Sequence, residues 1–411
     1  MTRRAPLLAG RALALLGIVL VSASLRTAAT SLSPIVDAVG SDIPLDAVGL
    51  GILGMLPPIM FALAGLLAPR ISHRLGLEPF LILAIVAMVA GLAARAAAAE
   101  YGVLFAGTLV ALAAAGVGNI LLPPLVKRYF PDRIGLVTAL YATCISLGTV
   151  LPPAFAFPIA DLAGWRTSLA VWAVLAVLSL PPWIAVLAQN RRSSRAAALD
   201  PAPELVEAAP AMVGRVWHSR TAWVIAIVFS LTSFQAYSLF AWLPALLVAQ
   251  VGVGELEAGL LLAFWGLLGM IASILAPILT ARLRNVGWIL HIGGAGFVLG
   301  YLGLLVAPGA SPWLWVSLCG LGQGIFPAGL ALINLRTRTH DGSIALSGFV
   351  QFVGYTIAAL GPLLVGVLHD VTGGWTASLM LLTATSALFV YFGVVLRRPT
   401  FVEDETANRR S

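Results

Sequence analysis

The amino-acid sequence predicts an all-α membrane protein in which twelve transmembrane helices form two pseudo-symmetric six-helix bundles. Its 411 residues are 60% hydrophobic and only 10% charged, whereas soluble domains carry about 25% charged residues. This composition excludes an ordinary soluble protein. A helix that crosses a bilayer needs about 20 predominantly apolar residues, and twelve segments approach or exceed that length. They are residues 12–36, 47–68, 79–96, 103–126, 134–157, 165–187, 221–248, 256–279, 288–306, 312–335, 343–367 and 375–396.

An internal repeat supports the division into two halves. The tetrapeptide GVGN at 116–119, followed by Pro123, recurs as GLGQ at 320–323, followed by Pro327, and every position is shifted by 204 residues. Two six-span units of one design are the simplest explanation. The start of the chain imitates a cleavable secretory signal, but cleavage would remove the first span, so we expect that span to be retained. The expected parts are a first bundle at 1–188, a cytoplasmic linker at 189–220, a second bundle at 221–398 and a cytoplasmic tail at 399–411.

The basic residues predict the orientation. If both termini and the linker are cytoplasmic, 21 of the 24 lysines and arginines fall on that side, and the outer loops contain only Arg95 and Arg166. Cytoplasmic loops of membrane proteins are rich in lysine and arginine. We therefore expect a multi-pass protein of the inner (plasma) membrane with both termini in the cytoplasm. The basic residues occur singly or in pairs between apolar segments, which excludes a nucleic-acid-binding patch.

Arg26 is the one basic residue near the middle of an expected span. A charge at that depth costs about 2.5–3.5 kcal/mol on the insertion scale, and all seventeen Asp and Glu residues fall in loops, at span ends or in the tail. One explanation is structural: the guanidinium forms hydrogen bonds to helix carbonyls and hydroxyls, or extends outward toward Asp37. The other is functional: the guanidinium faces a central cavity, and the substrate is its counter-ion. A guanidinium offers two parallel donors and suits a small planar anion. Ser22 and Thr30 share its helix face.

Other polar and aromatic side chains are expected at comparable depth in other spans. Such residues either contact a substrate or join helices through hydrogen bonds, and the sequence does not separate these roles. Besides Arg26 and Thr30, the candidate substrate contacts are Asn119, Tyr141, Tyr237, Trp242, Gln351 and Tyr355. His291 is the only histidine inside an expected span. It is a candidate coupling residue because histidine titrates near neutral pH, although its place near the cytoplasmic end suits gating better.

Several short strings together carry a family resemblance. They are SLR at 24–26, PPLVKRYF at 123–130, AWLP at 241–244, CGLG at 319–322 and FVQ at 349–351. With twelve spans and a central linker, the chain resembles the major facilitator superfamily and, within it, the cyanate permease and 2-nitroimidazole transporter family. The resemblance implies a secondary transporter of small molecules. Arg26 matches the family's first-span arginine, and Trp242 and Gln351 match its seventh- and eleventh-span positions.

One loop departs from the superfamily pattern. The motif between the second and third spans normally carries an Asp and a Gly, but here Pro69 and Ser72 stand in those places. A gating latch based on that carboxylate is therefore not expected. Arg70 and Arg74 remain as the loop's candidate gating residues.

These observations predict a transporter and no enzyme, since the core offers no paired acids, metal cluster or activated nucleophile. We expect a secondary active or facilitative transporter that moves a small anion or small planar polar solute by alternating access, with Arg26 as the substrate anchor. Three couplings stay open: passive flux or anion exchange, a proton carried with the substrate, and titration of His291. The alternatives are an exporter of neutral drug-like or nitro-heterocyclic compounds and, from a different class, a transport-dead membrane sensor. We expect a monomer in the lipid bilayer, an anionic substrate and no cofactor.

Overall fold

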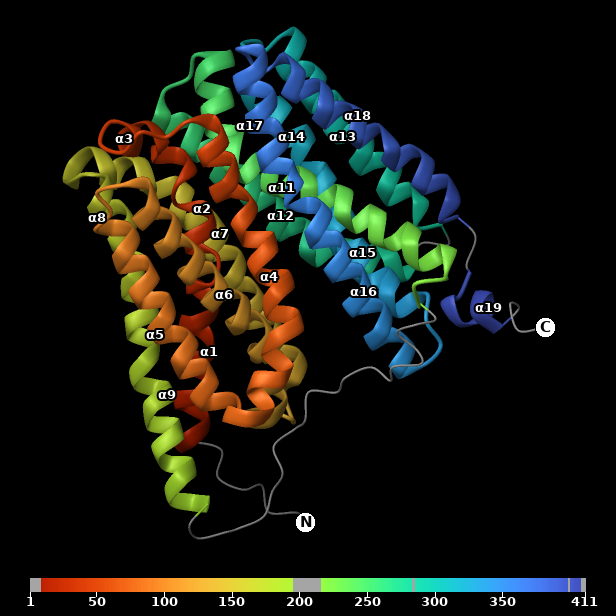
Figure 1. The fold of residues 1–411 in the computed structure, drawn as a ribbon. Coiled ribbons are helices and arrows are strands. Elements are labelled where there is room, and N and C mark those ends of the chain that lie inside the picture. Colours follow the sequence, from red (N-terminus) through yellow and green to blue (C-terminus); the bar gives the residue numbers. More distant parts are fainter. Residues whose placement is uncertain (1–8, 195–215, 283–284, 398–399, 408–411) are drawn as a thin grey trace.

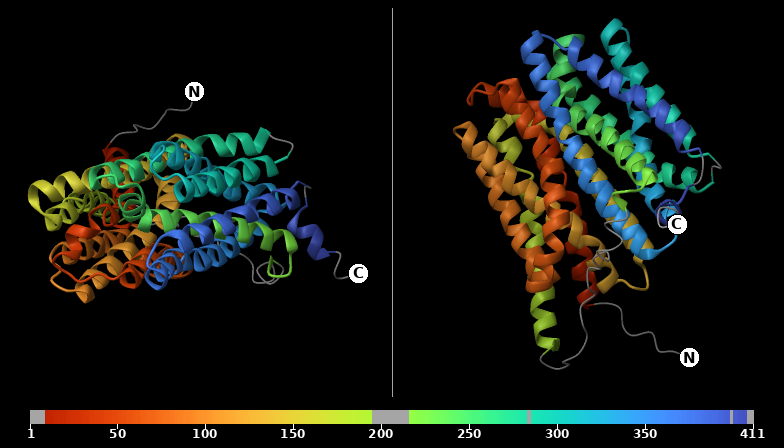
Figure 2. Two further views of the ribbon diagram at one scale, coloured as in Figure 1. Left: turned by 90° about the horizontal axis from the view of Figure 1, so that it is seen from above. Right: turned by 45° about the vertical axis from the view of Figure 1, so that its right-hand side comes forward.

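The computed structural model describes residues 9–194, 216–282, 285–397 and 400–407, and all regular structure within these ranges is helical. Twelve helical segments are long and apolar enough to cross a membrane, which confirms the predicted number of spans. Six belong to each half of the chain, and the two sets form two bundles that lie side by side (Figures 1 and 2).

The first bundle contains ten helical elements. They are α1 (Ala9–Ser24), α2 (Thr27–Thr30), the 3-10 helix η1 (Ser33–Ile35), α3 (Val36–Gly40), α4 (Ala47–Leu75), α5 (Leu77–Ala96), α6 (Tyr101–Tyr129), α7 (Ile134–Ala163), α8 (Trp165–Ala170) and α9 (Ala173–Ser194). Most of the expected linker, residues 195–215, lies outside the described residues, and α9 reaches into its first part. The domain boundaries therefore stay predictions.

The second bundle is followed by a short helix of the expected tail. Its elements are α11 (Arg220–Val251), α12 (Glu255–Arg282), α13 (Gly287–Val306), α14 (Pro312–Leu321), the 3-10 helix η2 (Gly322–Gly324), α15 (Ile325–Leu335), α16 (His340–Ala358), α17 (Leu360–Thr372) and α18 (Thr376–Val395), and the tail helix is α19 (Val402–Ala407). Helix α11 contains the most buried span of the chain, because it packs on helices of both bundles.

Charge distinguishes the two ends of the bundles. We call the end at which α1 begins and α9 ends the basic end, and the opposite end, where α3 lies, the acidic end (Figure 1). Among the described residues, the basic end carries Arg11, Arg70, Arg74, Lys127, Arg128, Arg133 and Arg220, with Glu78 paired to Arg128 and Asp132 paired to Arg11, and the acidic end carries Asp42, Asp46, Glu100, Asp161 and Glu255, with Arg166 paired to Asp42.

The first span is interrupted, which corrects the expectation of one continuous segment at 12–36. Helix α1 ends at Ser24, Arg26 occupies the N-cap position of α2, and α2 is only one turn long. Hydroxyl groups explain the break. Ser24 and Thr27 donate to the carbonyls three residues earlier, at 2.7 and 2.9 Å, and such back-bonding bends helices by competing with the backbone ladder.

The bundles touch each other most closely in the acidic half. A Cβ atom on Gly259 of α12 would lie 2.6 Å from the Pro153 carbonyl oxygen of α7, and one on Gly51 of α4 would lie 3.0 Å from the Pro362 carbonyl oxygen of α17. Only glycine allows helices to approach this closely. The interface between the bundles is therefore shut by backbone contacts at this end.

Candidate functional site

A cavity of about 180 Å³ lies between the two bundles. Both bundles contribute to its wall, through α2 and α7 on one side and α11, α12, α13, η2 and α15 on the other. Its lining residues are Arg26, Ala29, Thr30, Ile145, Ser146, Thr149, Thr232, Ser233, Ala236, Tyr237, Phe240, Gly266, Gly269, Met270, Ser273, Phe297, Gln323, Phe326 and Pro327.

Arg26 supplies the only formal charge in this lining. Its guanidinium carbon lies 4.7 Å from the ring centroid of Phe61, a cation–π distance, and the phenol of Tyr237 lies close enough to interact with the guanidinium. Within the described ranges no carboxylate forms an ion pair with Arg26. The break between α1 and α2 therefore presents a partly buried cation to the cavity without an anionic partner.

Aromatic side chains support the wall around Arg26. Tyr355 packs behind the lining, with its ring 6.3 Å from Tyr237 and 6.4 Å from Phe61. Phe229 lies 5.3 Å from Tyr355 and 4.9 Å from Phe326. Tyr355 packs against Tyr237 without lining the cavity itself, so it is a supporting residue in this conformation.

Hydroxyl groups form a polar band along the rest of the wall. Thr30 donates to the Arg26 carbonyl at 3.1 Å, and Thr232 donates to Val228 at 2.8 Å, so their oxygens keep lone pairs for a bound solute. Ser233 is 1% exposed and its hydroxyl has no partner in the described structure. A buried polar group without a partner is costly, and a hydrogen-bonding solute in the cavity would relieve that cost.

A second interrupted span contributes Gln323 to the lining. The residue lies in the 3-10 turn η2, between α14 and α15, and its side-chain amide donates to the Trp265 carbonyl on α12. The cavity is thus flanked by breaks in the first and the tenth span. Discontinuous helices of this kind commonly build solute sites in transporters, because the breaks free backbone and side-chain polar groups.

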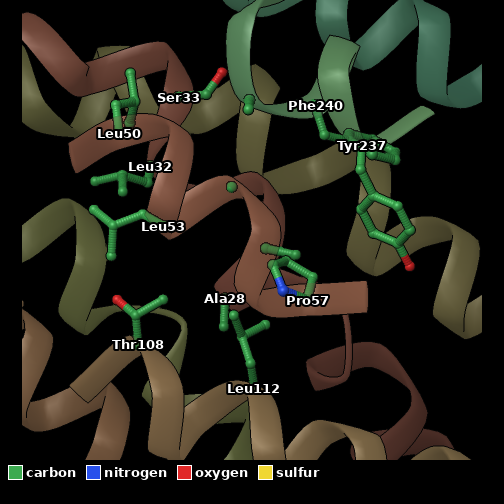
Figure 3. A pocket seen from close by; sticks show the side chains of 13 residues that line it. Ala28, Leu32, Ser33, Leu50, Leu53, Pro57, Thr108, Leu112, Tyr237 and Phe240 are labelled. Atoms are coloured by element: carbon green, nitrogen blue, oxygen red, sulfur yellow. The ribbon is translucent and has the colours of Figure 1, made fainter. Parts of the chain in front are cut away.

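A smaller pocket of about 30 Å³ adjoins the cavity toward the acidic end (Figure 3). It shares Ala29, Tyr237 and Phe240 with the cavity. Figure 3 shows Ala28, Thr108 and Leu112 on one wall and Tyr237 with Phe240 on the opposite side. The volume is enough for about one water molecule, so in this conformation the pathway narrows from the cavity to the acidic end.

Several sequence-predicted residues lie outside the cavity lining. Asn119 and Tyr141 are half-buried on α6 and α7. The Trp242 indole donates to the Pro362 carbonyl at 2.8 Å, and the Gln351 amide donates to Ser347 at 2.8 Å. Of the predicted substrate contacts, the structure brings together Arg26, Thr30 and Tyr237 in the lining, with Tyr355 directly behind.

The coupling and gating candidates lie away from the cavity. His291 on α13 is 3.2 Å from the Val390 carbonyl oxygen of α18, at the periphery of the second bundle. Arg70 and Arg74 are exposed on the last turns of α4, which continues to Leu75, and a single glycine separates α4 from α5. The expected loop is thus almost entirely helical.

The basic end holds each bundle together with polar contacts inside that bundle. Glu78, at the start of α5, accepts hydrogen bonds from Tyr129 at 2.5 Å and Arg128 at 3.3 Å on α6. In the second bundle, Glu405 of α19 accepts hydrogen bonds from Thr221 and Ser219. Burial alone would raise the pKa of Glu405, but these hydrogen bonds outweigh it and lower the pKa.

Arg95 corrects one sequence expectation. It does not lie in an outer loop: it occupies the last turn of α5, is 1% exposed, and donates from Nη1 to the Ala28 carbonyl at 2.7 Å. The apolar segment at 79–96 already contained it, but a position at the end of a span did not mark its side chain as buried. The sequence also missed Phe61, Phe240 and Phe326, because aromatic residues in spans give no sign of which face they occupy.

Comparison with known proteins identifies relatives along nearly the whole chain. The family described as the Major Facilitator Superfamily matches residues 14–359. The chain is 30% identical to an uncharacterized transporter of Bacillus subtilis, over 96% of each chain. It is 31% identical to the 2-nitroimidazole transporter of Escherichia coli, over 93% of this chain and 94% of that one, and 27% identical to the cyanate transport protein of Escherichia coli, over 88% and 91%.

A solved structure agrees with the fold. A bacterial homolog of the human lysosomal transporter Spinster, in an inward-facing and unoccupied conformation, superimposes with a TM-score of 0.75 at 13% identity, covering 96% of this chain and 98% of that one. This similarity shows the arrangement of the helices and carries no information about the transported solute.

Proposed function

Because this chain belongs to the major facilitator superfamily, and specifically resembles its cyanate and 2-nitroimidazole transporters, we propose that it moves a small anion or small planar polar solute by alternating access, with Arg26 as the anchor. Membership of this family makes the chain a transporter of small solutes with twelve spans, and not an enzyme. The anchor, the charge of the solute and the mechanism are the proposal.

The observation that carries the proposal is the uncompensated charge of Arg26. The guanidinium faces a cavity between the bundles and has aromatic and phenolic neighbours but no described carboxylate within ion-pair distance. A charge in a low-dielectric interior is stabilised by a counter-ion. A solute anion supplies that counter-ion, and the hydroxyls of Thr30 and Ser233 complete its hydrogen bonds.

Alternating access is supported by the difference between the two halves of the interface. Glycine contacts shut the acidic half, whereas the cavity lies between the bundles at mid-depth and toward the basic half. Rocking of one six-helix bundle against the other about such a site is the expected motion of the superfamily. We assign the described conformation to the state open toward the cytoplasm.

The orientation of the chain is part of the proposal. The basic residues of the basic end favour a cytoplasmic location for it, and so for both termini. Single cysteines at Arg195, which lies outside the described residues, and at Glu257 of α12, in a background without Cys144 and Cys319, should be labelled from opposite faces of the inner membrane. Labelling of both from outside would overturn the orientation.

The proposal predicts which ligands stabilise the protein. Purified protein would be heated with cyanate, nitrate, acetate, benzoate or the neutral 2-nitroimidazole, since a ligand at 100 times its Kd stabilises by about 2.7 kcal/mol. We expect at least one anion to raise the melting temperature. The variant Arg26→Gln should weaken binding of that anion about 30-fold or more, because removing one partner of a buried charge pair costs about 2–5 kcal/mol, and Arg26→Lys should also bind weakly if two parallel donors matter.

The matched control is Arg133→Gln, which removes an arginine whose side chain is 60% exposed. It should leave both the fold and the ligand response unchanged. Wild-type anion affinity in Arg26→Gln would contradict the anchor. Stabilisation by 2-nitroimidazole alone, unaffected by Arg26→Gln, would favour export of neutral heterocycles in place of anion transport. We expect the protein to be a monomer in these experiments, and the mass of the purified particle tests this.

A further inference from the structure

A second arginine is buried without a counter-ion, on the acidic-end side of Arg26. Arg95 is 1% exposed, and its single described hydrogen bond runs from Nη1 to the Ala28 carbonyl. Its Nε and Nη2 atoms have no partner in the described structure, and none of the described carboxylates forms an ion pair with it. Arginine keeps its charge in proteins, so the first bundle contains a second cation that its own side chains do not neutralise.

A role in stabilising the break in the first span does not explain why a charged guanidinium is buried here. The break after α2 leaves the Ala28 carbonyl without the helical donor it would have in a continuous helix, and Arg95 satisfies it. One neutral donor would be enough for that purpose. Burying a full charge with two donor atoms idle is costly, so the helix break alone does not explain why this residue is an arginine.

The location of Arg95 connects it to the solute pathway. Its hydrogen-bond partner Ala28 lines the small pocket, together with Thr108 of α6 (Figure 3). The neighbouring residue Gly107 touches the α5 backbone, because a Cβ there would lie 2.8 Å from the Arg95 nitrogen. Arg95 therefore lies behind the wall that Ala28 and Thr108 form, while Arg26, two residues before Ala28, faces the larger cavity.

The small pocket lies where the bundles must separate when the acidic end opens. Leu50 and Leu53 of α4 and Tyr237 and Phe240 of α11 line it from opposite bundles. Parting of the bundles widens the space between these walls. Ala28, Thr108 and Arg95 all belong to the first bundle and stay together during that motion.

We propose that Arg95 acts through the wall formed by Ala28 and Thr108, and that its positive field attracts the solute anion into the small pocket, on the acidic-end side of Arg26, when that pocket widens. This inference rests on the proposed anion transport. At the rim of the acidic end, Arg166 is paired with Asp42, whereas Asp46, Asp161 and Glu255 form no described ion pair with a basic residue and repel an approaching anion. A fixed cation just inside the rim offsets that repulsion and raises the local anion concentration.

The test measures the local electrostatic field with a reporter cysteine. Thr108→Cys, in a background without Cys144 and Cys319, would react with the anionic sulfonatoethyl and the cationic trimethylammonioethyl methanethiosulfonates, added at the face of the acidic end. Each rate is divided by that reagent's rate with free cysteine in solution. We expect the anionic reagent to be favoured by about tenfold or more. If the two normalised rates are equal, or if the cysteine reacts with neither reagent, the proposal is wrong. This outcome is already decisive in the protein that keeps Arg95.

Variants then assign the field to one arginine. Arg95→Gln should abolish the preference for the anionic reagent, Arg95→Lys should retain it, and Arg26→Gln should leave most of it in place. A preference that survives Arg95→Gln and disappears in Arg26→Gln would assign the field to Arg26 and reject the proposed role of Arg95. The reporter does not depend on solute binding, so failure of the anion anchor at Arg26 would be seen separately, in the melting experiment with cyanate, nitrate or benzoate.

Discussion

The acidic and basic halves of the interface between the bundles are held by different kinds of contact. In the acidic half, glycines and prolines bring the backbones of α4 and α17, and of α7 and α12, into direct contact across the two bundles. In the basic half, the polar contacts of Glu78 and Glu405 join helices within one bundle each. The contacts described between the bundles at the acidic end are packing contacts, so separation there costs mainly van der Waals contacts, while hydrogen bonds keep each bundle intact.

The largest expected effect comes from blocking closure of the acidic half. Gly259→Trp places a large ring where a Cβ alone would lie 2.6 Å from the Pro153 carbonyl oxygen, so the two bundles cannot meet there. We expect solute flux to fall by at least about 100-fold, because a transporter that cannot close its acidic end cannot complete the transport cycle. The labelling rate of the Thr108→Cys reporter from the acidic-end face should rise by about tenfold.

Gly254→Trp is the matched control for this change. It lies five residues before Gly259, and a Cβ there would meet nothing within 4 Å. Flux and reporter labelling should stay near the values of the parent protein. If Gly259→Trp also transports normally, the glycine contacts do not close the pathway, and the proposed difference between the two halves is wrong.

A smaller effect is expected at Trp242, which lies in the acidic half. Its indole donates to the Pro362 carbonyl at 2.8 Å and packs on Trp375, with ring centroids 5.5 Å apart. Trp242→Phe keeps an aromatic ring but removes the donor, which should cost about 0.5–1.5 kcal/mol of stability. The anion affinity measured by thermal shift should change less than about threefold, which corresponds to under 1 kcal/mol.

The opposite outcome for Trp242 would restore the sequence-based interpretation. If Trp242→Phe weakens the anion tenfold or more with little loss of melting temperature, the indole walls the solute site in another conformation. Phe240→Leu provides the comparison, since Phe240 lines both the cavity and the small pocket. That variant should lower affinity more than Trp242→Phe does.

The contrast between Arg26 and Arg95 shows which features the sequence could predict. The twelve spans and the repeat follow from length, hydropathy and spacing, and Arg26 stood out because a charge in the middle of a span is costly unless something compensates it. Arg95 did not stand out in the sequence, because a charged residue at the end of a span is normally solvated. Its side chain instead reaches Ala28 of the interrupted first span, and no local pattern in the sequence reveals such a contact between two spans.

The orientation of each helix about its axis was the other unpredictable feature. Spans that are apolar all round give little sign of which face turns inward. Trp242 and Gln351 therefore looked equivalent to Tyr237 in the sequence, although in the structure Tyr237 alone of the three lines the cavity. Phe61 was passed over for the same reason, and it lies against the Arg26 guanidinium.

The smallest effect is expected at His291, in the basic half. The imidazole is 3.2 Å from the Val390 carbonyl oxygen, between α13 and α18 and outside the cavity lining. A proton carrier must exchange protons with the solute pathway, and nothing in the described structure connects this side chain to Arg26. We therefore expect His291→Ala to change uptake into proteoliposomes by less than about twofold, under 1 kcal/mol in activation free energy, with an imposed pH gradient or without one.

The companion variant His291→Gln separates the two roles that the histidine could have. Glutamine can donate a hydrogen bond to the Val390 carbonyl but cannot carry a proton, so it should behave like the wild-type protein in both flux and stability. If uphill accumulation follows the pH gradient in the wild type and disappears in both variants while downhill exchange persists, His291 is the coupling residue. Exchange of anions on a lone Arg26, or a proton that travels with the solute, would then be the wrong mechanism.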